Sequence, residues 1–166
     1  MVIFETERLL FRSHTADDRA QFIEMHTDPQ VRRFVGGAAW SAGKARARFR
    51  AQYLGKPNGT YGLWAAVLKD EKKYIGCCGL TATDQPPHLA YYLARPYWGQ
   101  GLASEAARAF VELGTQELRL PLIAAVAEQG NVASERILAK LGFQEVRVER
   151  IGPRNLVHYL LSNELQ

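Results

Sequence analysis

Tyr91-Tyr92-Leu93-Ala94-Arg95-Pro96-Tyr97-Trp98-Gly99-Gln100-Gly101-Leu102-Ala103-Ser104-Glu105-Ala106 is the stretch of the chain that decides the fold. Its first four residues are apolar, which predicts a buried strand, and Pro96 ends that strand because proline has no backbone N–H. After Gly101, apolar residues recur at helical spacing. The glycine loop between strand and helix is either a tight connection only, or a place where the free N–H groups of a helix start meet an anion.

The loop does not fit the two best-known phosphate-binding patterns. A dinucleotide fingerprint needs a third glycine, but position 104 is Ser and the acidic residue comes early, at Glu105. No G-x-x-x-x-G-K-[ST] string occurs in the sequence, which argues against a P-loop NTPase. An anion site at this loop therefore implies a different fold.

The composition predicts one ordinary globular domain covering residues 1–166. Of these residues 47% are hydrophobic, enough for a sizeable core. We expect no signal peptide and no membrane helix, since charges interrupt the first apolar residues and no run approaches about 20 apolar residues. Cys77 and Cys78 are adjacent and should point to opposite faces of a strand, so we expect no disulfide and a cytoplasmic location. The net charge of +4 suits an anionic ligand, but it is too mild to argue for nucleic acid.

Hydrophobic periodicity and turn residues predict alternating strands and helices along the chain. We expect strands at 2–12, 61–69, 72–82, 91–94, 122–127, 143–151 and 155–161, and helices at 15–28, 41–54, 102–118 and 131–141. This order predicts an α/β fold, with a mixed sheet and helices on both faces.

Three segments, in order along the chain, resemble one known family. The segment from Trp98 to Ala106 resembles the acyl-CoA-binding motif of the GNAT N-acetyltransferases, [QR]-x-x-G-x-[GA]. Trp98 stands at the Gln/Arg position, as in the Rim branch of ribosomal-protein N-terminal acetyltransferases. Asn131-x-x-Ser134 with 138–143 (LAKLGF), and the opening 6–12 (TERLLFR), also resemble that branch. The resemblance implies the GNAT fold, with a central mixed, mostly antiparallel sheet.

The resemblance implies acetyl-CoA as co-substrate and no metal ion. In this family the pyrophosphate lies on the amides at the start of the central helix, and the pantetheine arm lies along the preceding strand. The implied acetyl-CoA-binding residues are Leu93, Trp98, Gly99, Gln100, Gly101, Leu102, Ala103, Ser104 and Asn131. Candidates for the 3′-phosphate are Arg95, Arg108, Arg136 and Lys140, although an exposed charge explains each of them as well. Asn131 also fits a plain helix N-cap.

Many GNAT enzymes protonate the departing thiolate with a Tyr that would fall at position 138, where this chain has Leu138. The Rim pattern implies Ser134 as the catalytic proton donor instead. Ser134 shares a helical face with Ile137 and Leu141, so its hydroxyl should point inward and needs a partner. Alternatively, the hydroxyl bonds back to a carbonyl one turn earlier, or caps the helix.

The sequence does not assign the general base that deprotonates the acceptor amine. Asp84, His88 and Glu128, and also Glu5, are candidates, and none of them lies in a recognisable local motif. The basic helix at 41–54 belongs to the part of the fold that covers the acceptor cleft in this family. Its charges either form a solvated face or attract an acidic acceptor.

The preferred function is an acetyl-CoA-dependent N-acetyltransferase that acts by direct attack in a ternary complex. The acceptor is a primary amine, either a protein N-terminus or a small molecule. The alternative is a GNAT-like module that binds acyl-CoA, or dimerises, without turnover; family members often form homodimers. A third reading is a basic nucleic-acid-binding domain, whose affinity would fall steeply with salt. We expect neither nucleic acid nor a membrane among the partners.

Overall fold

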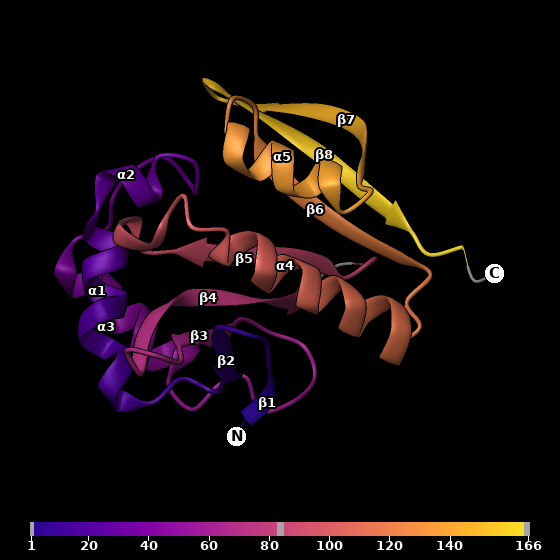
Figure 1. Cartoon of the computed structure of the whole chain (residues 1–166). Coiled ribbons are helices and arrows are strands. Elements are labelled where there is room, and N and C mark those ends of the chain that lie inside the picture. The colour runs from indigo at the N-terminus through magenta and orange to yellow at the C-terminus, as the bar shows by residue number, and fades with distance from the viewer. Residues whose placement is uncertain (1, 83–84, 165–166) are drawn as a thin grey trace.

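One eight-stranded sheet forms the centre of the computed structural model, which describes residues 2–82 and 85–164 (Figure 1). The strands are β1 (Val2–Glu5), β2 (Leu9–Arg12), β3 (Trp64–Leu68), β4 (Lys73–Thr81), β5 (His88–Leu93), β6 (Leu122–Glu128), β7 (Gln144–Ile151) and β8 (Arg154–Ser162). Their order is β1-β2-β3-β4-β5-β6-β8-β7, and only β5 and β6 run parallel. This confirms the predicted mixed, mostly antiparallel sheet.

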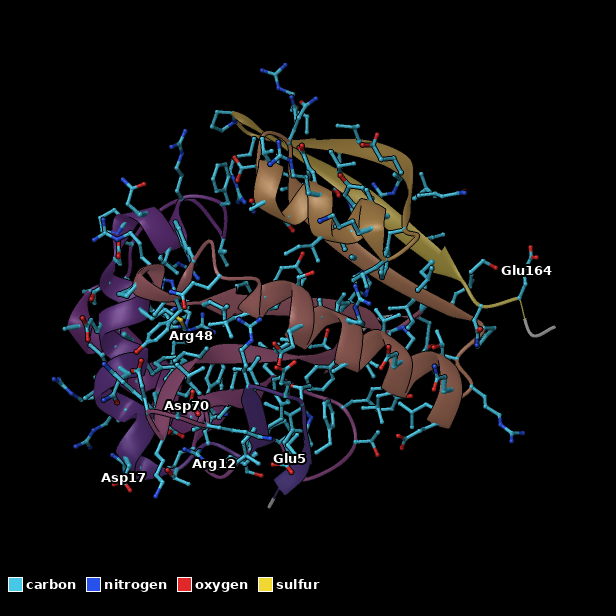
Figure 2. The ribbon with its side chains drawn as sticks, in the orientation of Figure 1. Glu5, Arg12, Asp17, Arg48, Asp70 and Glu164 are labelled. Atoms are coloured by element: carbon cyan, nitrogen blue, oxygen red, sulfur yellow. The ribbon has the colours of Figure 1, made fainter. Side chains whose placement is uncertain are left out.

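Five α-helices accompany the sheet: α1 (Arg19–Thr27), α2 (Pro29–Arg32), α3 (Ala42–Arg48), α4 (Leu102–Glu112) and α5 (Val132–Lys140). Within the part of the chain that the structure describes, none of the helices is long and apolar enough to cross a membrane. Charged side chains such as those of Asp17 and Glu164 project outward from the fold (Figure 2).

Local signals predicted most helix ends correctly. The Ser41 hydroxyl accepts a hydrogen bond from the Lys44 amide at 3.1 Å and starts α3. Gly142, with φ of +91°, follows α5 in the left-handed conformation that glycine favours. Short 3₁₀ turns at Ala16–Asp18 and Arg95–Tyr97 precede α1 and α4, and π-helical turns at Phe49–Tyr53 and Leu113–Glu117 follow α3 and α4.

Besides the strand expected at 61–69, which begins only at Trp64, two strand predictions were wrong in extent. The segment 2–12 is not one strand but the antiparallel hairpin β1–β2, closed by the Thr6 amide donating to the Leu9 carbonyl at 2.8 Å. The predicted strand at 91–94 begins earlier, at His88, because it pairs with β4 as far as Thr81. The hairpin pairs within its own segment, with Val2 opposite Arg12, whereas pairing with β4 sets the start of β5, and periodicity within a segment reveals neither boundary.

The middle strands β3 and β4 are buried on both faces, so adjacent residues of one strand lie in different cores. Ala66, Ile75 and Cys78 belong to a large core that includes residues of α4 and α5. Ala65 and Tyr74, which directly precede Ala66 and Ile75 in their strands, belong to a smaller core with residues of α1. This alternation follows from the two-residue period of a strand, and it places helices on both faces as predicted.

Cys77 and Cys78 are buried free thiols, as expected from their adjacent positions in a strand. Burial raises the pKa of Cys77 to about 12 and also raises that of Cys78. Because the thiolate is the reactive form of cysteine, both side chains are chemically inert packing groups.

His26 gives the protein an acid-sensitive core. It is 2% exposed, lies between Phe22 and Trp40 at centroid distances of 4.3 and 4.5 Å, and its ring nitrogens have no hydrogen-bond partner in the described structure. Burial, aided by the charge of Arg32, lowers the pKa of His26 to about 4. The neutral ring is therefore retained in the fold while the unfolded ring takes up a proton, so stability is lost as pH falls below the unfolded pKa.

We expect the free energy of unfolding to fall by about 2 kcal/mol more in the wild type than in His26→Leu between about pH 7.5 and about pH 5. Urea denaturation at the two pH values measures this difference. Comparing the variant with the wild type removes the contribution of His14, whose pKa burial also lowers. An identical pH dependence in both proteins would contradict the assignment.

Candidate active site

Strands β5 and β6 separate along their length and open the sheet. Their register contains one pair, His88 opposite Ala124, whereas every other neighbouring pair is matched at three or more positions. Beyond that pair the two strands diverge toward Leu93 and Glu128, as Figure 1 shows. Backbone groups along the opening have no neighbouring strand to pair with, so they are available to a ligand.

The glycine loop stands at the open end of β5, where α4 begins. Gly99 and Gly101 have φ values of +73° and +77°, in the left-handed region. A Cβ added at Gly99 would meet nothing within 4 Å, and one at Gly101 would meet only Arg8 Nη2 at 3.5 Å. Open space therefore faces the first amides of α4, which is the geometry of an anion cradle at a helix start.

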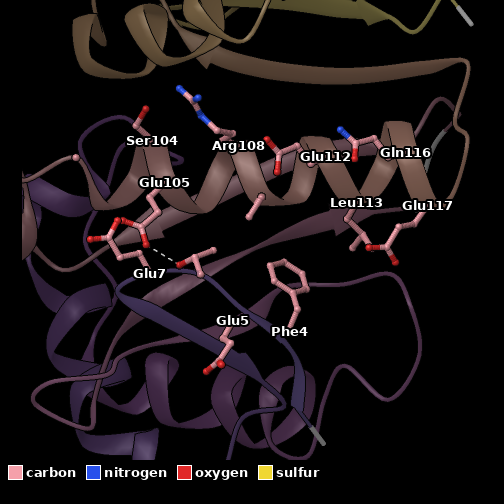
Figure 3. A pocket seen from close by; sticks show the side chains of 13 residues that line it. Phe4, Glu5, Glu7, Ser104, Glu105, Arg108, Glu112, Leu113, Gln116 and Glu117 are labelled. Atoms are coloured by element: carbon pink, nitrogen blue, oxygen red, sulfur yellow. Dashed lines mark hydrogen bonds between the residues drawn. The ribbon is translucent and has the colours of Figure 1, made fainter.

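Glu105 ties this loop to the N-terminal hairpin. Its Oε1 accepts hydrogen bonds from the Thr6 hydroxyl at 2.6 Å and the Arg8 amide at 2.9 Å, and its Oε2 pairs with Arg8 Nε at 2.7 Å. Figure 3 shows Glu105 pointing from α4 toward this hairpin. Arg8 Nη1 also holds the Gln100 carbonyl at 2.8 Å. Burial alone would raise the pKa of Glu105, but the hydrogen bonds from Thr6 and Arg8 outweigh it and lower that pKa.

A hydrogen bond from Trp98 connects the turn after β5 to the end of that strand. Its indole Nε1 donates to the Leu93 carbonyl at 2.8 Å, while the side chain remains 46% exposed. The Ala94 amide bonds back to Ile75 of β4, so by strand alternation the Leu93 amide points to the other side, into the opening. At Leu93 the carbonyl is thus already occupied, and the N–H is the group left for a ligand.

A pocket of about 450 Å³ follows the opening, and it brings together most of the residues predicted to bind acetyl-CoA. Among its lining residues are Leu93, Trp98, Gly99, Gly101, Leu102, Ala103, Ser104, Asn131 and Ser134. Gln100 does not line it, because its carbonyl is held by Arg8 and its side chain donates to the Pro96 carbonyl. A second pocket of about 260 Å³ adjoins the first, and Tyr91, Asn131 and Ser134 line both.

Ser134 makes a direct hydrogen bond across the opening. Its Oγ lies 2.8 Å from the hydroxyl of Tyr91 on β5. Burial raises the pKa of Tyr91 to about 12, so the phenol keeps its proton at neutral pH. Asn131 caps α5 by accepting from the Ser134 amide at 3.3 Å. Among the described residues, the Ser134 hydroxyl bonds neither to a carbonyl of its own helix nor as a cap, and Tyr91 is a pocket-lining residue that the sequence did not single out.

A family model described as Acetyltransferase (GNAT) domain matches residues 8–144 of the chain. The chain belongs to the GNAT acetyltransferase family. The uncharacterized N-acetyltransferase YoaA from Bacillus subtilis (strain 168) is 31% identical over 155 residues, which cover 89% of this chain and 86% of YoaA. The fold is similar to a GNAT-family acetyltransferase from Bacillus anthracis, with a TM-score of 0.84, 22% identity and 99% of each chain covered. It is also similar to RimL, a ribosomal L7/L12 α-N-protein acetyltransferase solved with coenzyme A, with a TM-score of 0.78, 13% identity and 100% of each chain covered.

The general-base candidates of this GNAT enzyme occupy different places. Glu128 lines the smaller pocket, where its Oε2 pairs with Arg154 Nε at 2.9 Å. His88 lies at the closed end of the opening and lines neither pocket. Asp84 lies outside the described residues. Across the described ranges, no three His, Cys, Asp or Glu side chains are placed to hold a metal ion.

The 3′-phosphate candidates also separate. Arg136 and Lys140 line the 450 Å³ pocket, whereas Arg95 pairs with Asp28 at 3.0 Å. Arg108 lies in a third pocket, a groove of about 710 Å³ between β1 and α4, together with Glu5, Glu7, Glu105, Glu112 and Glu117 (Figure 3). That groove is predominantly acidic, so it does not suit a CoA phosphate.

We expect Glu105→Gln to weaken acetyl-CoA binding by about tenfold, because the neutral amide loses the ion pair with Arg8 and loosens the glycine loop. Isothermal titration calorimetry measures the change. Glu112→Gln is the matched control, since Glu112 lies on the same helix and the same acidic groove but makes no ion pair in the described structure. Equal affinities of the two variants would show that the Glu105 tie does not position the loop.

Proposed function

We propose that this GNAT enzyme binds acetyl-CoA in the opening between β5 and β6 and transfers the acetyl group to a primary amine by direct attack in a ternary complex. The observation that carries the proposal is the junction of two pockets at the hydrogen-bonded pair Tyr91–Ser134. The larger of these two pockets, that of 450 Å³, reaches the glycine loop, and the smaller one, that of 260 Å³, extends away from it along β6. Donor and acceptor entering by separate pockets would meet at this pair, which is the alignment that a two-substrate reaction needs.

The residues of the larger pocket fit acetyl-CoA, which supplies a thioester-activated acetyl group when bound. Amides around Gly99, Gly101 and Ser104 would hold the pyrophosphate, because the loop leaves open space in front of the start of α4. The free N–H of Leu93 would bind an amide of the pantetheine arm. Arg136 and Lys140 are the best-placed cations for the 3′-phosphate.

Ser134 is proposed as the proton donor to the thiolate sulfur. When the protonated phenol of Tyr91 donates to Ser134 Oγ, the serine's own hydrogen is free to point into the pocket. Tyr91 would then orient Ser134 without itself touching the sulfur. Supplying a positioned proton to a leaving group typically contributes about 10²–10⁴ in rate.

For the general base, Glu128 is our proposal, directly or through a water molecule, because it is the carboxylate candidate that lines the smaller pocket. We also propose that the enzyme belongs to the Rim branch, on the basis of Trp98, Asn131 and Ser134 at the branch's motif positions. The buried free thiols of Cys77 and Cys78 support a cytoplasmic location. Because members of this family often form homodimers, a homodimer is also part of the proposal.

A calorimetric titration with acetyl-CoA, followed by an assay of thiol release with a panel of primary amines, tests this function. We expect micromolar binding and amine-dependent release of CoA. Binding without release for every amine would support the non-catalytic acyl-CoA module instead. Absence of binding would contradict the assignment of the larger pocket.

A further inference from the structure

Arg32, the last residue of α2, is a buried cation without an anionic partner. It is only 8% exposed, and in residues 2–82 and 85–164 no carboxylate forms an ion pair with it. The one hydrogen bond of its side chain in these residues runs from Nε to the Ala38 carbonyl, at 3.4 Å. By contrast, Arg12 makes a bidentate pair with Asp18 at 2.7 and 2.8 Å. Burying an unpaired charge is costly, so the arrangement needs a reason.

The surroundings of Arg32 add positive charge rather than compensate it. Its guanidinium lies 4.3 Å from the centroid of the Trp40 ring, and Lys44 and Arg48 approach the same ring at 5.5 and 5.8 Å. Arg48, on the helix whose basic character the sequence shows, is labelled in Figure 2. Burial lowers the pKa of Arg32; Tyr92 and Tyr53 act against this, and the charges of Arg154 and Arg48 act in the same direction as burial. The cluster therefore attracts an anion.

The cluster adjoins the smaller pocket. A Cβ added at Gly36 would lie 2.9 Å from Arg32 Nη2, and one at Gly37 would lie 3.9 Å from the Arg154 side chain. The loop at 34–37 thus passes directly over both arginines. Gly36 and Arg154 line the 260 Å³ pocket together with Ser134. Arg32 itself is not among the lining residues, but because residue 36 is glycine its guanidinium packs directly against this pocket-lining loop, where any side chain would displace it.

We propose that Arg32, supported by Arg48 and Arg154, binds a carboxylate of the acceptor, so that the substrates are amines that also carry a carboxylate, such as amino acids. This inference rests on the proposed function, since the amine must reach Tyr91 and Ser134. Arg32 is the natural centre of such a site because Arg154 is already paired with Glu128. A guanidinium matches a carboxylate through two parallel N–H donors, and both interactions strengthen where water is excluded. The pocket volume of about 260 Å³ suits a small acceptor.

Acceptor pairs that differ only in the carboxylate test this inference with the wild-type enzyme. The kcat/KM of free amino acids is compared with that of their carboxamides at saturating acetyl-CoA. The kcat/KM of the dipeptide amide Asp-Ala-NH2 is compared with that of Asn-Ala-NH2 in the same way. We expect kcat/KM to be at least about 30-fold higher for the carboxylate member of one pair type. A preference for the free amino acids over their carboxamides identifies a small-molecule acceptor. A preference for the Asp dipeptide over the Asn dipeptide identifies an acidic peptide N-terminus.

Equal or better turnover of the carboxamides would overturn the inference while leaving the acetyltransferase activity intact. A binding measurement answers the same question without turnover: the CoA-saturated enzyme is titrated with N-acetyl amino acids and with their amides. Tighter binding of the carboxylates supports the inference, and equal binding overturns it. Failure of acetyl-CoA itself to bind or react is a different result, and it would contradict the proposed function.

Arg32→Met removes the charge while keeping a long apolar side chain over Trp40. We expect KM for the carboxylate acceptor to rise about 30-fold, with KM for its carboxamide and for acetyl-CoA unchanged. Arg33→Met is the matched control, because Arg33 is the exposed neighbour that stacks on Phe34 at 5.0 Å. If Arg32→Met does not fold, Arg48→Met replaces it, with an expected rise of a few-fold in the same KM. A carboxylate preference as large as that of the wild type in either variant would overturn the assignment.

Discussion

Replacing Gly101 with Val is expected to weaken acetyl-CoA binding by at least about 100-fold. Gly101 is the residue immediately before α4 and has φ of +77°, a conformation that a β-branched side chain resists. A valine there would either move the loop out of this conformation or place two methyl groups in the open space before the helix amides. Both outcomes remove the approach that a pyrophosphate needs.

Backbone strain alone could lower affinity indirectly by destabilising the fold, so the experiment needs a glycine with the same conformation elsewhere. Gly55→Val supplies it, since Gly55 has φ of +72°, open space around its missing Cβ, and no place in the lining of the three pockets described. We expect this variant to lose stability but to bind acetyl-CoA normally. Calorimetric titration and thermal unfolding of both variants separate the two effects. Near-normal affinity of Gly101→Val would contradict the cradle assignment.

The parts of this fold that short-range signals encode could be predicted from the sequence. Ser41, Asn131 and Gly142 act on backbone groups within a few residues of themselves, so the helix starts expected at 41 and 131 and the helix end expected at 141 were predicted correctly. The glycine loop was also recognisable, because the strand, the loop and the helix are contiguous. Such signals located the central stretch and the order of elements.

What the sequence could not reveal depends on pairs that are distant along the chain. Glu105 is 99 residues from Thr6, and their contact joins α4 to the turn between β1 and β2 and holds the loop. Tyr91 was assigned only to a buried strand. The two-residue period of a strand shows that the side chains of Tyr91 and Tyr92 lie on opposite faces of the sheet, but it does not show which face α5 covers. Arg32 shows the same limit for charge, since only the tertiary structure reveals that a cation in a polar-looking segment is buried without a partner.

Replacing Ser134 with Ala is expected to lower kcat by about 100-fold while KM for acetyl-CoA stays within about threefold. The alanine keeps the backbone N–H that Asn131 caps, so α5 should remain intact. It removes the hydroxyl that would deliver a proton to the thiolate, and water would replace it less effectively. Steady-state kinetics with a good amine acceptor, combined with thermal unfolding, measure both expectations.

Tyr91→Phe and the double variant show whether the two hydroxyls act as a unit. The single Tyr91→Phe change leaves Ser134 in place but removes the partner that orients it, so we expect a smaller fall in kcat of about tenfold. If Tyr91 acts only through Ser134, the double variant should be no slower than Ser134→Ala, because the effects of linked groups are not additive. Additive losses would mean that the phenol has a separate role at the reacting atoms. An unchanged kcat in Ser134→Ala would instead reduce the pair to a structural hydrogen bond between β5 and α5.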